Sequence, residues 1–237
     1  MVMYSMDSFY NSETGECKFD SEDFISLLEL CNTFPKEYDY DSGESESTAS
    51  LLRSGKVLLT SVNMSSFSDI QMYPALYGEP VNFIGFPTNS GSGSVVGFNN
   101  RFCVAAKSKN KEGAWAFIRS FLLPDNQNKL DWNLPVNKAV FEQKIADAMK
   151  KQDDNDSVAS STWWYDDVEI TVGPLTEEDA QAVRDMVYNA TTEAAYDQQL
   201  MNIITEEAEY YFNGEKSAQE IAGIIQSRAQ LYIDENR

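Results

Sequence analysis

The chain has 237 residues, 42% of them hydrophobic, so it is long enough to bury one large core or two modest ones. Its 38 acidic residues outnumber its 18 basic residues, and the net charge of −20 excludes nucleic acid as the default partner. The sequence has no histidine, which excludes Ser-His-Asp and Cys-His nucleophiles and zinc sites built on histidine. No apolar run approaches the roughly 18 residues that a membrane span needs. We expect a soluble globular protein without a metal or cofactor.

The first third of the chain predicts one helix and two buried strands. Asp20 or Ser21 is a suitable N-cap for a helix with an apolar stripe of Phe24, Leu27, Leu28 and Cys31. The short apolar runs Val57–Val62 and Val81–Phe86 are typical of strands that are covered on both faces. A stretch rich in glycine and serine, residues 88–97, then predicts a turn.

A strand followed directly by a helix is predicted in the middle of the chain. Arg101–Ala106 has the apolar pattern of a buried strand, so Cys103 is expected to be buried, as is Cys31 on the first helix. Asn110 is a suitable N-cap for the next helix, which Pro124 ends. The apolar positions of this helix recur at helical spacing: Ala114, Trp115, Phe117, Ile118, Phe121 and Leu122.

The C-terminal half predicts helices with strong N-terminal signals. Asn137 opens a helix over residues 139–151, and a polar linker over residues 152–161 follows it. Thr176–Asp179 and Ser217–Glu220 have the spacing of capping boxes. Between them, a long helix is predicted from Asp197 to Phe212.

Two stretches of sequence resemble the second half of family 1 extracellular solute-binding proteins. The first is residues 105–118, Ala-Ala-Lys-Ser-Lys-Asn-Lys-Glu-Gly-Ala-Trp-Ala-Phe-Ile, followed by Leu134-Pro-Val-Asn-Lys138. The second is residues 196–232, with a Phe-Asn-Gly turn at 212–214 and Ile-Gln-Ser-Arg at 225–228. Such receptors are lipoproteins or periplasmic proteins that deliver carbohydrates to ABC transporter permeases. The resemblance implies a location at the extracellular face of the membrane or in the periplasm.

The resemblance also implies an α/β fold of the type II periplasmic-binding-protein-like, two-lobe kind, with a helix-rich C-terminal lobe. Residues 1–105 are then the first part of the C-terminal lobe, residues 106–156 a remnant of the N-terminal lobe, and residues 157–237 the final helices. The N-terminus has neither the basic flank nor the apolar core of a signal peptide. We therefore expect a truncated fold that lacks the export signal and the first segment of the N-terminal lobe.

Three adjacent aromatic residues, Trp163, Trp164 and Tyr165, are the strongest candidates for a ligand-binding site. Neighbouring side chains point in different directions, so all three cannot easily be core residues. Flat rings hold the apolar C–H faces of a sugar, and carboxylates hydrogen-bond its hydroxyls. The alternative is that the rings pack over a hinge or under the last helices.

Six further residues complete the predicted ligand-binding set. By resemblance to the family, Tyr196 at the start of a long helix stacks on the sugar, while Asp197 is either a second contact or the N-cap of that helix. Trp132 either lines the cleft or packs against Phe141. The remaining three follow a predicted strand, where open α/β sheets bind ligands: Asn63, Ser65 and Phe67.

The function expected from these features is capture of a sugar or oligosaccharide by lobe closure, without chemistry. The alternatives are a glycoside hydrolase that uses two of the four acids Asp166, Asp167, Glu169 and Asp197, or a truncated relic that binds nothing. The truncation would also leave apolar surface uncovered near Trp115, so self-association as a symmetric dimer is expected.

Overall fold

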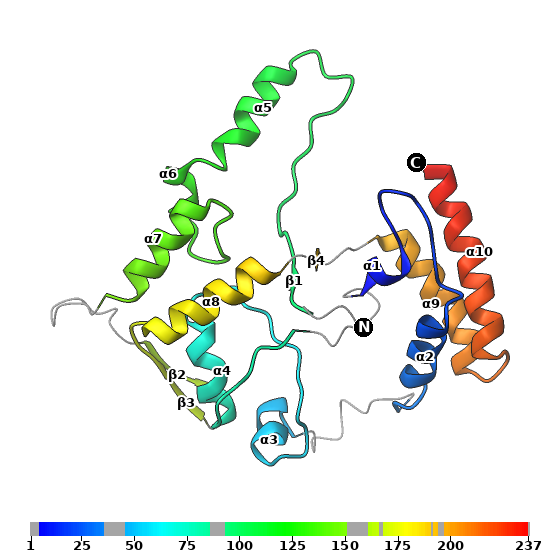
Figure 1. Cartoon of the computed structure of the whole chain (residues 1–237), viewed down its shortest axis with the longest axis horizontal. Coiled ribbons are helices and arrows are strands. Elements are labelled where there is room, and N and C mark those ends of the chain that lie inside the picture. Colours follow the sequence, from blue (N-terminus) through cyan, green and yellow to red (C-terminus); the bar gives the residue numbers. More distant parts are fainter. Residues whose placement is uncertain are drawn as a thin grey trace. The chain divides into compact units, whose positions relative to one another are not determined.

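The computed structural model describes residues 5–35, 46–85, 93–150, 161–165, 168–190, 192–193 and 197–236. The chain divides into two compact units, which we describe separately (Figure 1). The first comprises Met1–Ser45, Gly85–Gly97 and Ala190–Arg237, and the second comprises Glu46–Ile84 and Phe98–Asn189. These units divide the chain at other positions than the predicted lobes, and the assignment of lobes stays a prediction.

The first unit is mainly helical. It contains α1 (Met6–Phe9), α2 (Glu22–Cys31), α9 (Gln198–Phe212) and α10 (Ala218–Asn236). Two short strands, β1 (Val95–Val96) and β4 (Thr192–Glu193), form a parallel pair. Helix α10 packs against both α2 and α9. Figure 1 shows α9 and α10 as an antiparallel pair.

The core of this unit lies between α10 and the N-terminal segment. The ring of Phe24 meets two other phenylalanine rings edge to face, with centroids 5.2 Å from Phe9 and 5.1 Å from Phe19. The amides of Gln226 and Gln230, on α10, hold the backbone beside this cluster: their oxygens accept bonds from the backbone N–H groups of Phe19 and Cys17. The apolar positions of α10 complete the core: Ala218, Ile221, Ala222, Ile225, Ala229 and Ile233.

The second unit combines helices with one hairpin. Its helices are α3 (Thr48–Arg53), α4 (Asp69–Tyr77), α5 (Lys111–Ser120), α6 (Pro124–Gln127), α7 (Lys138–Ala148) and α8 (Glu177–Asn189). Strands β2 (Ser161–Tyr165) and β3 (Val168–Val172) pair antiparallel, with Trp163 opposite Ile170. Among the described residues, no helix of either unit is long and apolar enough to cross a membrane.

Two apolar clusters stabilise the second unit. One joins α7 to α8 and is centred on Phe141, Ile145 and Val183. The other packs α4 and α3 against β3, with Leu76, Ile170 and Val172 buried. Glu142 on α7 and Arg184 on α8 form an ion pair at 2.9 Å beside the first cluster, so both apolar and polar contacts hold these two helices together.

The predicted helix starts are confirmed at the residues that the sequence indicates. Ser21, Asn110, Asn137 and Asp197 each accept a hydrogen bond from a backbone N–H of the first turn of their helix. Both capping boxes form in the expected reciprocal way, and in the second one Ser217 and Glu220 bond each other's backbone N–H. Of the described residues, 51% are helical, which fits the expected mixed α/β class.

The predicted buried strands are wrong for the described residues. Val57–Val62, residues 81–84 and Arg101–Ala106 are extended or irregular, and none belongs to a strand. Gly85 forms an isolated bridge with Gly93. A strand needs a neighbour to bond its backbone, and these segments have no neighbouring strand among the described residues. Consequently Cys103 is exposed rather than buried as expected. Cys31 lies at the end of α2 and is half-buried, so its expected burial is also wrong.

Candidate functional site

A polar cleft of about 500 Å3 lies within the second unit. Three parts of the chain form it: the loop before α4, the loop between α6 and α7, and one face of α7. Its lining residues are Ser65, Ser66, Phe67, Asn128, Leu130, Asp131, Asn133, Leu134, Gln143, Lys144 and Asp147. The volume falls in the range of small-molecule sites, about 300–1,000 Å3.

Asp69 orients the serine side of the cleft. It is the first residue of α4 and only 8% exposed, and one carboxylate oxygen accepts bonds from the backbone N–H groups of Ser65 (2.7 Å) and Ser66 (2.8 Å). The hydroxyls of Ser66 and Ser68 lie 2.9 Å apart. Because one side-chain oxygen accepts from two successive backbone N–H groups, the loop is held in place.

Asn133 joins the serine loop to the opposite loop. Its backbone N–H donates to the carbonyl of Ser65 at 2.9 Å, and its side-chain oxygen accepts from Asn99 at 2.7 Å. Its backbone φ of 73° lies in the left-handed region, which asparagine tolerates better than most residues. The residue therefore fixes a sharp bend at the edge of the cleft.

Gln127 and Lys144 hold the loop between α6 and α7. The buried amide of Gln127 donates to the carbonyl of Phe121 and accepts from the backbone N–H of Val136, at 2.7 and 2.8 Å. The ammonium of Lys144 donates to the carbonyl of Leu130 at 2.7 Å. These bonds close both ends of the loop, so its polar side chains project from a fixed backbone.

The cleft carries one well-defined charge arrangement on α7. The carboxylate of Asp147 accepts from Lys150 at 2.5 Å and from Gln143 at 3.0 Å. The bond with Lys150, and then that with Gln143, holds the pKa of Asp147 below its ordinary value. Asp147 is therefore ionised at neutral pH. Hydroxyls, amides and a carboxylate beside the Phe67 ring can hydrogen-bond a neutral polyhydroxylated ligand and contact its apolar face.

A second, smaller hollow of about 260 Å3 lies where α4 meets the hairpin. Tyr73, Tyr77 and Tyr165 contribute to its lining, and the first two rings are stacked with centroids 6.0 Å apart. The hydroxyl of Tyr73 donates to the carbonyl of Asn63 at 2.9 Å. Burial raises the pKa of Tyr73 and of Tyr77, so both phenols stay protonated at neutral pH.

The predicted site residues occupy several places. Ser65 and Phe67 line the polar cleft, and Tyr165 lines the smaller hollow with the tyrosines of α4. Asn63 lines neither, and its backbone carbonyl accepts the bond from Tyr73. Trp132 stands between two lining residues and is 76% exposed, so the alternative that it packs against Phe141 is wrong. Phe141 instead contacts the rings of Phe67 and Tyr188.

The remaining predicted residues lie in the hairpin and in the first unit. Trp164 pairs with Glu169 in the hairpin and is 65% exposed. The side chain of Trp163 and all of Tyr196 lie outside the described residues, as do Asp166 and Asp167. The carboxylate of Asp197 caps α9 through the N–H of Leu200 and accepts from the hydroxyl of Tyr232.

Most of the polar cleft was not expected from the sequence. The available signal was the spacing of Gln143, Lys144 and Asp147, which places polar groups on one face of a helix. That spacing is equally typical of a solvated helix surface. Only the presence of a loop facing α7 distinguishes a cleft from such a surface. Asp69 gave the stronger hint, as an acid at the first position of a helix.

Residues 18–156 match the family model of bacterial extracellular solute-binding proteins, and the chain belongs to that family. The matched range contains every residue that lines the polar cleft. No curated protein matches the sequence. Family membership establishes the general role, which is extracellular capture of a solute for transport.

Proposed function

We propose that the chain binds a carbohydrate in the polar cleft and delivers it to the permease of an ABC transporter. The observation that supports a sugar is the composition of the cleft. Two serines, the amides of Asn128, Asn133 and Gln143, and the carboxylates of Asp131 and Asp147 line a space of about 500 Å3. A neutral ligand with many hydroxyls matches this set better than a strongly charged one, because acids and a lysine are both present.

Aromatic contact is the second requirement of a sugar site. Phe67 supplies a ring in the lining. Trp132 is not itself a lining residue, but it lies in sequence between the lining residues Asp131 and Asn133, and its indole is exposed. A ring that stacks on a sugar contributes on the order of 1–2 kcal/mol. Capture would follow closure of the predicted lobes, and the parent protein would be a lipoprotein or a periplasmic protein.

A glycoside hydrolase has less support. Of the four acids considered, Asp197 already caps α9 and binds Tyr232, and Glu169 is exposed on the hairpin. General acid and nucleophile must face one sugar from defined distances. The two other acids lie outside the described residues, so no pair of this kind supports the hydrolase.

The proposal is tested by titration calorimetry of the full chain with a panel of mono- and oligosaccharides. We expect Trp132→Ala and Gln143→Ala each to weaken binding by about tenfold. Trp164→Ala is the matched control for the first variant, because Trp164 is a similarly exposed tryptophan outside the cleft. Gln181→Ala is the control for the second, because Gln181 bonds Asp185 on α8 as Gln143 bonds Asp147 on α7.

Two results would contradict this assignment. Loss of binding in Trp164→Ala alone would move the site to the hairpin and the smaller hollow. If the chain binds none of the sugars, the result would support the alternative of a truncated protein that binds nothing, or a solute of another class.

A further inference from the structure

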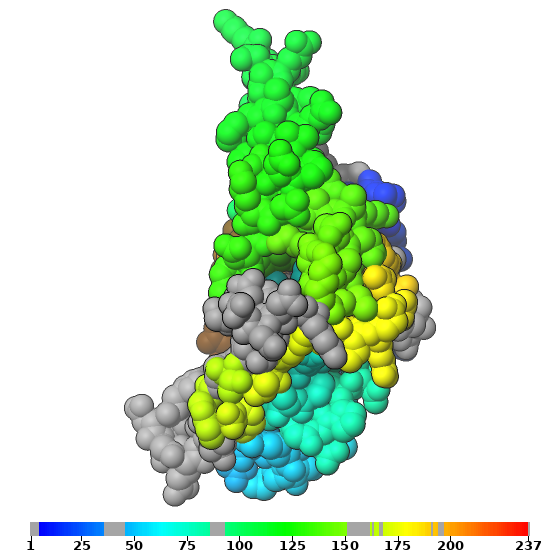
Figure 2. All heavy atoms as spheres, turned by 90° about the vertical axis from the view of Figure 1, so that its left-hand side faces the viewer, coloured from blue at the N-terminus to red at the C-terminus, as the bar shows by residue number. Residues whose placement is uncertain are grey.

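An exposed face that combines aromatic and basic residues lies on residues 98–123 of the second unit. Helix α5 has no buried residue, and Trp115 and Phe117 are 54% and 64% exposed. The other large apolar residues on this face are also exposed: Phe102, Phe121, Leu122 and Leu123. In Figure 2 the green spheres of this segment stand uncovered on the visible face. The rings of Phe102 and Phe117 both contact the ring of Phe121, and an exposed apolar cluster of this kind marks an interaction site.

The segment before α5 is an extended chain with an unused backbone. Among the described residues, the backbone N–H and C=O groups of Phe102, Cys103 and Val104 have no hydrogen-bond partner. The ring of Phe102 stacks on that of Phe121, with centroids 4.8 Å apart, which ties the extended chain to the end of α5. Exposed donors and acceptors in a β-prone sequence are a template for an added strand.

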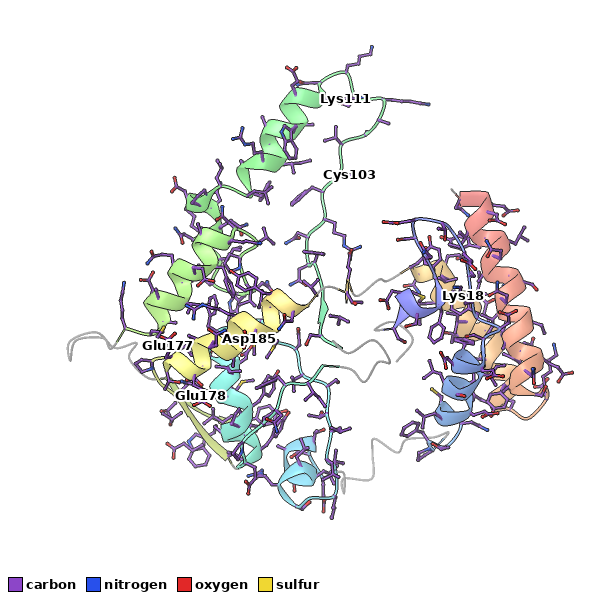
Figure 3. All side chains as sticks on the ribbon, in the orientation of Figure 1. Lys18, Cys103, Lys111, Glu177, Glu178 and Asp185 are labelled. Atoms are coloured by element: carbon purple, nitrogen blue, oxygen red, sulfur yellow. The ribbon has the colours of Figure 1, made fainter. Side chains whose placement is uncertain are left out.

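The charge of this face is opposite to that of the whole chain. Residues 98–123 contain five basic residues and one acid, a net charge of +4, whereas the chain as a whole carries −20. Lys107, Lys109 and Lys111 have no ion-pair partner among the described residues. Figure 3 shows Lys111 at the start of α5 and Cys103 on the extended segment. A binding partner that complements this face must therefore be apolar and acidic.

We propose that the face binds an acidic polypeptide, which adds a β-strand along residues 102–104 and covers the rings of α5. This proposal does not rest on the proposed function. The strand would satisfy the free backbone groups, its apolar side chains would cover Phe117 and Phe121, and its carboxylates would pair with the lysines.

A second copy of the chain fits this face less well. Antiparallel self-pairing centred on Val104 places Arg101 opposite Lys107 and joins two surfaces of charge +4. Like charges directly opposite each other destabilise a sheet. An anionic lipid surface matches the charge and the aromatic rings, but it offers no partners for the backbone of an extended chain. An acidic strand supplies the negative charge, the apolar side chains and the backbone hydrogen-bond partners that this face requires.

The test uses the full chain and a short synthetic peptide in which valine alternates with glutamate. A matched peptide alternates valine with lysine. Binding is followed by fluorescence anisotropy of the labelled peptide and by the rate at which iodoacetamide alkylates the exposed thiol of Cys103. We expect the glutamate peptide to bind and to slow alkylation of Cys103, with Cys31 on α2 as the internal reference. The lysine peptide should do neither.

Charge-reversal variants test the electrostatic part of the proposal. Lys109→Glu combined with Lys111→Glu should weaken binding of the glutamate peptide by about tenfold or more. Lys18→Glu combined with Lys216→Glu changes the net charge equally in the first unit, and it should leave the affinity unchanged. Figure 3 marks Lys18 on the loop before α2.

Proline variants test the backbone part of the proposal. Successive N–H groups of an extended chain point to opposite edges, so Cys103→Pro and Val104→Pro remove donors from different edges. At least one of them should abolish binding, while Val104→Thr, which keeps the N–H, should bind normally. Far-ultraviolet circular dichroism checks that all variants keep the wild-type fold.

Three results would overturn the proposal. Equal binding of both peptides would show apolar adhesion without charge selection. Binding to phosphatidylglycerol vesicles, with no affinity for the glutamate peptide, would identify a lipid surface. A concentration-dependent dimer in light scattering, again without peptide binding, would identify a second copy.

Discussion

The backbone N–H of Asn133 donates a hydrogen bond of 2.9 Å to the carbonyl of Ser65, and this bond joins the two loops that line the polar cleft. The bond depends on the left-handed conformation of Asn133, with φ of 73°. The shape of the cleft thus depends on a backbone conformation that few side chains tolerate.

The effect of replacing Asn133 on the free energy of unfolding should therefore depend on the conformational freedom of the new residue. We expect Asn133→Gly to unfold with nearly the wild-type free energy, because glycine adopts positive φ without strain. Asn133→Val should lose about 1–3 kcal/mol in urea denaturation, because a β-branched residue is strained there. Asn128→Val, on the same loop at an αR position, is the control. Equal stabilities of the glycine and valine variants would contradict this explanation.

Asp69→Ala should destabilise the second unit. The substitution leaves the N–H groups of Ser65 and Ser66 without their acceptor, which costs about 1–3 kcal/mol. Asp69→Asn keeps an acceptor oxygen and should recover part of the loss. Glu29→Ala, which removes an exposed acid of α2, should change the free energy of unfolding little. If the alanine variants at 69 and 29 unfold alike, the carboxylate of Asp69 does not hold the loop.

The ion pair between α7 and α8 should make stability depend on pH. Hydrogen bonds from Arg184 and then from Tyr188 hold the pKa of Glu142 below its ordinary value. A depressed folded-state pKa contributes stability above the unfolded-state pKa of about 4.3, and that contribution is lost as the pH falls through the folded-state value.

The stability difference between the wild type and Glu142→Gln should thus be present at neutral pH and vanish in acid. Urea denaturation across this range measures the difference. Carbon-13 NMR titration supplies a second readout: Arg184→Gln should raise the pKa of Glu142 toward its ordinary value. An unchanged pKa in that variant would show that the ion pair does not form in solution.

The three thiols should differ widely in reactivity. Burial, and then the charge of Asp234, raises the pKa of Cys17 to about 11, whereas Cys103 is exposed. The thiolate is the reactive form, so mildly alkaline iodoacetamide should modify Cys103 quickly and leave Cys17 intact until the chain unfolds. Peptide mass mapping follows each site, and urea-denatured protein is the control. Equal rates at the two thiols in the folded chain would place Cys17 at the surface.

The helices were the part of the fold that the sequence predicted best. Ser21, Asn110, Asn137, Asp197 and the two capping boxes occupy the helix starts that their sequence neighbours indicate. A cap bonds a backbone group two or three residues away, so all of its determinants lie within one short window of sequence. The family resemblance carried the general function for a similar reason, because its motifs are contiguous.

Strands and the cleft depended on residues far apart in the chain. Arg101–Ala106 has the composition of a strand, yet a strand forms only when a second segment bonds its backbone, and its own pattern cannot supply that neighbour. The cleft likewise needs Ser65 beside Asn133, a contact that the packing of α7 near the loop before α4 creates. Sequence by itself determined where helices begin and to which family the chain belongs. Only the tertiary structure decided which polar groups share a cleft and which apolar residues stay exposed, because both follow from contacts between segments that no local pattern encodes.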